Sequence, residues 1–159
     1  MLFKKIILNS SNILLFLSIL FLQCKNSQVP NTIADQTLAF SVEANECYGE
    51  CPVYIFQLFS DGSLQYEGKK HVERLGSYSG VIGDAQNEKL FQLLDVMNFY
   101  EMKIKNDPKL SDGSSMHFYA KKNERENKVL YHLPKRQAME NLKELVLSII
   151  DESEWKSDN

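Results

Sequence analysis

The sequence lacks any long run of basic residues. Lysine and arginine stand singly or in short pairs such as Lys69-Lys70 and Lys121-Lys122, and the 159-residue chain has a formal net charge of −3. Proteins that bind nucleic acids usually gather positive charge on one face, where it neutralises phosphate groups. We therefore expect no nucleic-acid partner, and we expect the basic pairs to lie in solvated turns.

Short catalytic signatures are missing as well. The chain contains no Gly-x-Ser-x-Gly nucleophile motif, no His-Glu-x-x-His zinc motif and no glycine-rich phosphate loop before a helix. The histidines His71, His117 and His132 have no spacing that ties them to a cysteine pair as zinc ligands. These absences predict a protein that is not an enzyme and that carries no cofactor and no metal.

An apolar run is present near the N-terminus. It extends from Ile13 to Leu22 and follows two basic residues, Lys4 and Lys5. This length is typical of the apolar region of a secretory signal and is shorter than the roughly 20 residues that a membrane span needs. Residues 1–23 are therefore predicted to be a signal peptide, and a retained membrane span is the alternative.

The apolar run ends at a cysteine. The stretch Leu20-Phe21-Leu22-Gln23-Cys24 resembles a bacterial lipoprotein signal, although Phe21 and Gln23 stand where that pattern usually has leucine and a small residue. The resemblance implies cleavage before Cys24, acylation of this residue with fatty chains such as palmitate, and attachment to a membrane. Secretory cleavage without lipid is the main alternative. We expect the protein in a bacterial cell envelope, exposed to the periplasm or the exterior, on a flexible tether of residues 24–36.

Two further cysteines, Cys47 and Cys51, enclose a short loop. If Cys24 carries lipid, these two remain as a pair in an oxidising compartment, where a disulfide is expected, and Gly49 lets the chain bend between them. Closing five residues stabilises a fold by about 2 kcal/mol. Thiol-redox chemistry and metal binding are alternatives. The redox alternative is weakened because the spacing exceeds Cys-x-x-Cys and an apolar strand follows, not a helix.

The hydrophobic pattern predicts an α+β fold with a mainly antiparallel sheet and the order β-β-β-β-α-β-β-α. Apolar content of 43% suits a single globular domain, which we place at residues 37–152. The strands are expected at about 38–42, 53–59, 64–67, 72–82, 116–120 and 128–133, and the helices begin at Asp84, as a capping residue, and at Pro134.

Both helices are predicted to pack on one face through apolar stripes, with Leu90, Phe91, Leu94 and Met97 in the first helix and Met139, Leu142, Leu145, Val146, Ile149 and Ile150 in the second. The strand at 116–120 is predicted from the alternation of Met116, Phe118 and Ala120 with His117 and Tyr119.

Some details of this prediction concern single segments. The strand at 53–59 is apolar at nearly every position, so it is predicted to be central and covered on both faces. Asp61-Gly62 predicts a tight turn, and Gly76 and Gly80 predict bulges or close approaches. Residues 98–112 are expected to form a loop, and 153–159 a polar tail in which Trp155 either packs back or stays exposed.

The motif around the cysteine pair resembles a known family. It reads Cys47-Tyr48-Gly49-x-Cys51-Pro52-x-Tyr54, then Asp61-Gly62, Tyr66-x-Gly68, Val72 and Gly76, with Asp112 and the small residues after it continuing the pattern. The sequence is similar to the bacterial domain-of-unknown-function family numbered 6438 over about Leu38 to Asp151. Domains of this family are common in envelope proteins and lipoproteins. The resemblance supports the fold and the location, and it implies no catalytic or binding residue because no activity is established for the family.

Together these features predict a lipid-anchored envelope protein that acts as a binding module for an envelope protein or polymer. Tyr48 and Glu50, beside the cysteines, are the expected contact residues, and the sheet face without helices is a second expected surface. One alternative is an inhibitor-like module that blocks an extracellular hydrolase with a rigid loop. Another is a thiol-redox or metal-dependent enzyme that uses Cys47 and Cys51.

Overall fold

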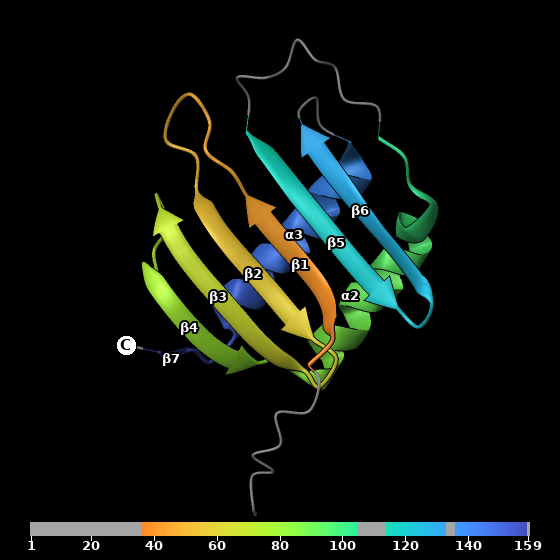
Figure 1. Cartoon of the computed structure of the whole chain (residues 1–159), viewed down its shortest axis with the longest axis horizontal. Coiled ribbons are helices and arrows are strands. Elements are labelled where there is room, and N and C mark those ends of the chain that lie inside the picture. Colours follow the sequence, from red (N-terminus) through yellow and green to blue (C-terminus); the bar gives the residue numbers. More distant parts are fainter. Residues whose placement is uncertain (1–35, 105–113, 133–135, 159) are drawn as a thin grey trace, which may run out of the picture. The chain divides into compact units, whose positions relative to one another are not determined.

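The structure is a computed structural model that describes residues 36–104, 114–132 and 136–158. The predicted signal peptide (1–23), the lipidation residue Cys24 and all but the last residue of the predicted tether (24–36) lie outside these ranges. No helix within the described ranges is long and apolar enough to cross a membrane. The elements, labelled in Figure 1, are β1 (Leu38–Ala44), β2 (Val53–Phe59), β3 (Ser63–Lys70), β4 (Gly76–Val81), α2 (Asp84–Val96), the 3-10 helix η2 (Phe99–Glu101), β5 (Ser115–Lys122), β6 (Arg125–His132), α3 (Gln137–Glu152) and β7 (Lys156–Ser157).

The strands form one antiparallel sheet in the order β6-β5-β1-β2-β3-β4-β7. The chain builds β1 to β4 as a meander, and α2 then carries it across to β5 and β6, which add beside β1 (Figure 1). α3 returns over the sheet and brings β7 to the edge of β4. The predicted α+β fold and the order of its elements are confirmed, and β7 is an additional strand.

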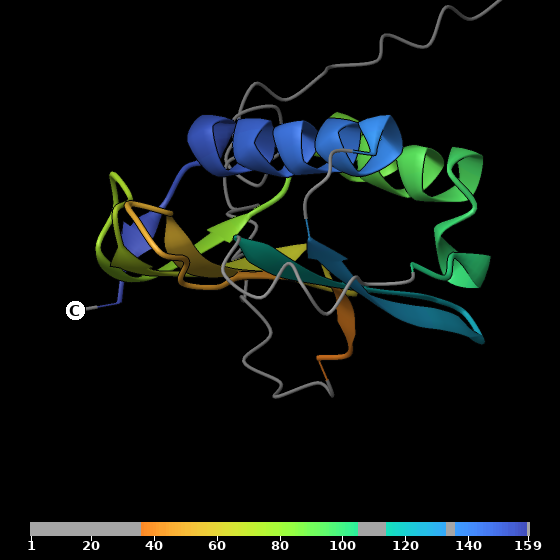
Figure 2. The same cartoon turned by 90° about the horizontal axis from the view of Figure 1, so that it is seen from above.

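Both helices cover the same face of the sheet, as predicted (Figure 2). The core lies between these layers, and its largest fully buried side chains are Phe40, Val42, Phe56, Leu58, Leu64, Leu90, Leu94, Phe99, Phe118, Met139, Leu142 and Ile149. Burial alternates along β2, where Tyr54, Phe56 and Leu58 are buried and the residues between them are half-buried. The prediction that this strand is covered on both faces is therefore wrong. An antiparallel sheet needs cover on one face only, and apolar side chains on the open face of β2 shield one another in part.

The helices differ slightly from the prediction at their starts. Gly83 is the N-cap residue of α2, and Asp84 is the first helical residue. The negative charge of Asp84 interacts favourably with the helix dipole, and no side chain makes a capping hydrogen bond. The predicted apolar face of α2 packs inward, with Leu90 and Leu94 fully buried. α3 begins at Gln137 and buries the predicted apolar stripe, while Pro134 lies outside the described ranges.

The segment predicted as a loop at 98–112 begins with a helical turn that is part of the core. Phe99 and Tyr100 of η2 are buried, and the side-chain amide of Asn127 donates hydrogen bonds to the carbonyl oxygens of Phe99 (2.7 Å) and Met102 (2.9 Å). This contact joins η2 to β6. It was not predicted because its partners are far apart in the sequence, and residues 105–113 lie outside the described ranges.

The strand boundaries at two hairpins also differ from the prediction. β3 extends to Lys70, and β4 starts only at Gly76, because residues 71–75 turn back over β3. β5 and β6 are joined by two residues, Asn123 and Glu124, instead of the predicted longer turn. The Asp61-Gly62 turn is confirmed, and the Asp61 carboxylate accepts hydrogen bonds from the Ser63 amide (3.0 Å) and hydroxyl (2.6 Å).

The segment after α3 closes against the core. Trp155 packs against Tyr66, with ring centroids 5.7 Å apart, and its indole nitrogen donates a hydrogen bond to the carbonyl oxygen of Ile150 (2.7 Å). Gly80 leaves room for this indole, because a Cβ there would lie 3.2 Å from a ring carbon of Trp155. The predicted close approach at Gly80 is thus confirmed. Of the two alternatives for Trp155, the structure has the packed one.

Replacing Trp155 by alanine should remove both its ring contacts and its hydrogen bond. Because the side chain is partly buried, we expect the free energy of unfolding to fall by about 2–3 kcal/mol. Urea denaturation followed by circular dichroism measures this loss. Val96→Ala, at a side chain that is 80% exposed, is the control and should change stability by less than about 0.5 kcal/mol. Equal stability of the two variants would contradict the structural role of Trp155.

Candidate functional site

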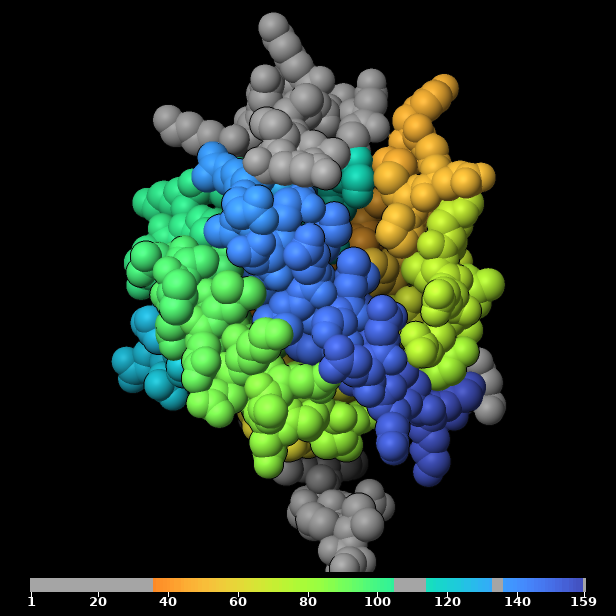
Figure 3. Space-filling view, turned by 180° about the vertical axis from the view of Figure 1, so that it is seen from behind, coloured from red at the N-terminus to blue at the C-terminus, as the bar shows by residue number. Residues whose placement is uncertain are grey.

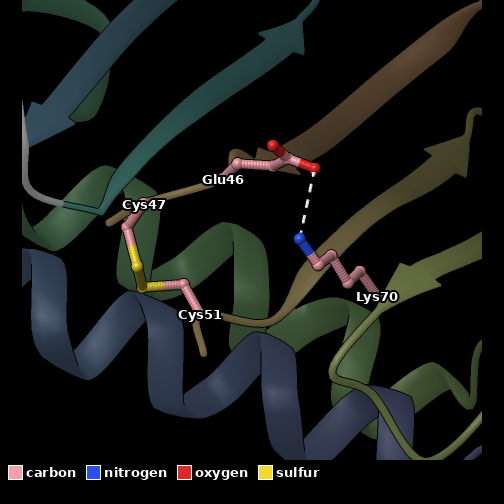
Figure 4. Close-up of a disulfide and its surroundings, with 4 residues drawn as sticks. All are labelled: Glu46, Cys47, Cys51 and Lys70. Atoms are coloured by element: carbon pink, nitrogen blue, oxygen red, sulfur yellow. Dashed lines mark ion pairs between the residues drawn. A yellow bond between two sulfur atoms is a disulfide. The ribbon is translucent and has the colours of Figure 1, made fainter. Parts of the chain in front are cut away.

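The loop between β1 and β2 is closed by a disulfide. Cys47 and Cys51 are bonded to each other, and their Cα atoms are 5.8 Å apart (Figure 4). The predicted disulfide is present. The bond joins the two arms of the loop just before Pro52 leads into β2, so it fixes the direction in which the chain enters the middle strand of the sheet.

Tyr48 stands at the tip of this loop. The amide of Gly49 donates a hydrogen bond to the carbonyl oxygen of Cys47 (2.8 Å), which makes a three-residue turn centred on Tyr48. The tyrosine side chain is 98% exposed, and Glu50 is exposed beside it. Figure 3 shows the loop, in orange, protruding from one end of the molecule. Both residues expected to make contacts are therefore accessible.

Contacts below the cysteines hold the base of the loop. The backbone amide of Asn45 donates a hydrogen bond to the carbonyl oxygen of Ser115 (3.0 Å), and the Asn45 side chain donates one to the Ser115 hydroxyl (3.2 Å). Glu46 forms an ion pair with Lys70 of β3 at 3.9 Å (Figure 4). Because both side chains of that pair are more than half exposed, solvent screens it, and the hydrogen bonds to Ser115 are the firmer support.

A cleft of about 230 Å³ lies next to the loop, between α3 and the turn that joins β3 to β4. Its aromatic and apolar lining is Pro52, Tyr54, Tyr66, Val72, Leu147 and Ile150. Its polar lining is His71, Glu73, Arg74 and Asp151. Pro52 belongs to both features, so the loop and the cleft form one continuous region of the surface.

Two tyrosines form the aromatic wall of the cleft. Tyr54 of β2 and Tyr66 of β3 stack with ring centroids 5.9 Å apart, and the side chains are 3% and 5% exposed. Neither hydroxyl has a hydrogen-bond partner among the described residues. Burial raises the pKa of Tyr54 well above its ordinary value of 10.0, and the neighbouring Tyr66 raises it further. Both phenols therefore stay protonated at neutral pH.

Charged side chains line the cleft together with Tyr66. Burial is the main cause that raises the pKa of Tyr66, Arg74 opposes this increase, and Asp151 and Glu73 add to it. The cleft thus presents phenol groups, one cation and two carboxylates around a small apolar space.

The turn beside the cleft is fixed against β3 at Gly68. A Cβ at this position would overlap the carbonyl group of Arg74 and would lie 2.9 Å from a methyl carbon of Val72. Only glycine lets residues 71–74 fold down this closely over the sheet. The close approach therefore sets both the position of Arg74 and the width of the cleft.

Sequence reasoning found the loop but not the cleft. Tyr54 and Tyr66 were part of the motif, but their inward direction follows from the register of the sheet. Arg74 and Asp151 come from a turn and a helix that are far apart in the chain. The alternation of side chains between the two faces of a strand is the one signal that could have placed these tyrosines on the face that bears the core.

The structure also places the histidines. His71 is exposed in the turn beside the cleft, while His117 and His132 are half-buried on β5 and β6. In the part of the chain that the structure describes, no group of three or more His, Cys, Asp or Glu side chains could hold a metal ion.

Comparison with known proteins assigns the chain to a family. The family model described as Domain of unknown function (DUF6438) matches residues 38–152, which is more than half of the chain. The protein belongs to this family. The matched region runs from the first residue of β1 to the last residue of α3, so it contains the loop, the cleft and both helices. No curated protein and no solved structure matches the chain.

Removing the disulfide should weaken the fold without abolishing it. For Cys47→Ser with Cys51→Ser we expect the free energy of unfolding to fall by about 2 kcal/mol, because the closed loop has only five residues. Urea denaturation with and without a reducing agent measures this. The unsubstituted protein should lose the same amount on reduction, and the double variant should not respond.

Thiol labelling tests directly whether Cys47 and Cys51 are bonded. In a chain that carries Cys24→Ser, Cys47 and Cys51 are the remaining cysteines. The folded protein should not react with a thiol reagent until a reductant is added. Rapid labelling of one cysteine in the native state would contradict the disulfide and favour redox chemistry.

Proposed function

We propose that this protein is a binding module of a bacterial cell envelope, anchored to a membrane by lipid on Cys24 and exposed to the periplasm or the exterior. Its contact surface is the Cys47–Cys51 loop together with the neighbouring cleft. The observation that carries the proposal is the position of Tyr48, which is 98% exposed at the tip of a loop closed by a disulfide. The partner is an envelope protein or polymer, and no enzymatic activity is proposed.

The loop has the properties of an efficient contact element. A tyrosine offers a large amphipathic surface with few rotatable bonds, and tyrosines are frequent among the residues that dominate binding energies. The disulfide and the hydrogen bonds to Ser115 hold the loop before any partner arrives. Binding therefore costs little ordering of the chain, which leaves more of the contact energy available as affinity.

The proposed tether determines where a partner must be. Residues 24–36 comprise a short polar segment, and a flexible chain of this length has a root-mean-square extension of about 20 Å. After cleavage before Cys24 the chain has 16 basic and 21 acidic residues, a net charge of −5. An anionic domain on such a tether stays close to the membrane, and its partners lie near that surface.

The anchor is tested by Cys24→Ala. Two or more acyl chains bind a membrane stably, so we expect the unsubstituted protein in the membrane fraction and the variant in the soluble fraction of the cell envelope. Fractionation followed by immunoblotting measures this, and mass spectrometry of the N-terminal peptide reports the lipid directly. A variant that remains as firmly membrane-bound would refute lipid attachment at Cys24.

The contact surface is tested by Tyr48→Ala. Because truncation of a central interface tyrosine commonly costs more than about 2 kcal/mol, we expect at least a tenfold weaker capture of the envelope partner. Pull-down from envelope extracts with the immobilised domain identifies the partner. The dissociation constant of the captured component is then measured for the unsubstituted protein and for the variant. Val96→Ala is the matched control, because it truncates another exposed side chain on a different element.

The outcomes of the pull-down separate the candidate functions. Equal capture by the Tyr48 and Val96 variants would refute the loop as the contact surface. A captured hydrolase whose activity falls on binding would favour the inhibitor-like module, which would use the same protruding loop.

A further inference from the structure

We propose that the cleft beside the loop, lined by Tyr54 and Tyr66, binds one ring of a neutral saccharide. This inference rests on the proposed function and names the class of ligand for part of its contact surface. It places the protein among glycan-binding modules, with the cleft holding a sugar ring and the Tyr48 loop lying at its border.

The hydroxyl groups of Tyr54 and Tyr66 are available to a ligand. Tyr54 and Tyr66 are 3% and 5% exposed, and neither hydroxyl is hydrogen-bonded within the described residues. The buried Tyr131, in contrast, uses its hydroxyl, which donates a hydrogen bond to Glu140 at 2.9 Å. Among the described residues, the buried side-chain atoms without a partner include the Tyr100 hydroxyl but neither the Tyr54 nor the Tyr66 hydroxyl, so both of these keep some contact with the solvent of the cleft. Each can therefore exchange hydrogen bonds with a ligand in the cleft without first giving up a bond to the protein.

The lining of the cleft carries charges of both signs. Arg74 contributes one positive charge, and Glu73 and Asp151 contribute two negative charges around the same space. An anionic ligand would meet two carboxylates, and a cationic one would meet the guanidinium group. A neutral ligand with hydroxyl groups avoids both conflicts, because a hydroxyl both donates to carboxylates and accepts from arginine or a protonated phenol.

The cleft has the size of a small ring. A volume of about 230 Å³ lies below the range of roughly 300–1,000 Å³ that is usual for sites of drug-sized ligands. This is about the volume that seven or eight molecules occupy in liquid water, and a single small ring fits such a space. Val72, Leu147 and Ile150 offer apolar contact to the C–H face of such a ring, while its hydroxyl edge faces the phenols.

The chain contains its own reporter for this site. Trp155 is the single tryptophan, and its ring centroid lies 5.7 Å from that of Tyr66. We would titrate the mature protein with the trisaccharides maltotriose, cellotriose and tri-N-acetylchitotriose, following Trp155 fluorescence, and would confirm binding by calorimetry. At least one sugar should bind, and Tyr54→Phe and Tyr66→Phe should each weaken its binding about tenfold, because each deletes one hydroxyl and leaves the ring.

Tyr119→Phe is the matched control. The Tyr119 hydroxyl bonds to Glu126 at 3.1 Å on the sheet face that the helices leave open, so this variant should bind the sugar as the unsubstituted protein does. Denaturation curves of all three variants show that the fold is retained. Binding that is equally strong in the Tyr54, Tyr66 and Tyr119 variants would overturn the assignment of the site.

The remaining outcomes separate this inference from the proposed function. If no trisaccharide binds while Tyr48-dependent capture from envelope extracts persists, the saccharide inference is refuted and the binding module stands. The same holds if the captured partner is a protein whose binding depends on Tyr54 and Tyr66, or if acetate or inorganic phosphate binds in place of the sugars. If sugars bind but no envelope partner is captured, the cleft assignment stands and the loop proposal fails.

Discussion

The packing of α3 against the inner face of the sheet is the contact on which the other features depend. This helix buries Met139, Leu142, Val146 and Ile149 over the strands, and it supplies Leu147, Ile150 and Asp151 to the cleft. It also delivers Trp155 to the ring of Tyr66 and the short strand β7 to the edge of β4. Without α3 the large aromatic side chains of β2 and β3 would face water, and the cleft would have no second wall. Burial of that apolar surface is the main driving force for this arrangement.

The loop and the cleft depend on different kinds of constraint. The loop is held by a covalent bond between two of its own residues and, at its base, by hydrogen bonds from Asn45 to Ser115 of β5. The cleft is held by the close approach at Gly68 and by the helix, so its shape depends on the tertiary fold as a whole. Pro52 links the two, since it follows the disulfide and lines the cleft. A displacement of the loop can therefore shift Pro52 and so alter the lining of the cleft.

Local patterns in the sequence predicted most of the elements and their order. The alternation in β5, the apolar stripe of α3 and the Asp61-Gly62 turn each depend on neighbours in the chain, and all three were correct. The errors have a common cause. Burial on one face of β2, the core position of Phe99 and the strand β7 depend on contacts between distant segments, which periodicity does not report. For the same reason Tyr48 could be named in advance, while the assembly of Tyr54, Tyr66, Arg74 and Asp151 could not.

The order of elements also affects how the sheet acquires its cover. All six longer strands precede α3, so a chain that becomes available for folding from its N-terminus presents the inner face of the sheet before its main cover exists. α2 alone leaves much of that face open, including the region of Tyr54 and Tyr66 over which α3 lies. A chain that lacks α3 would therefore expose an aromatic surface, and exposed apolar surface of this kind promotes aggregation.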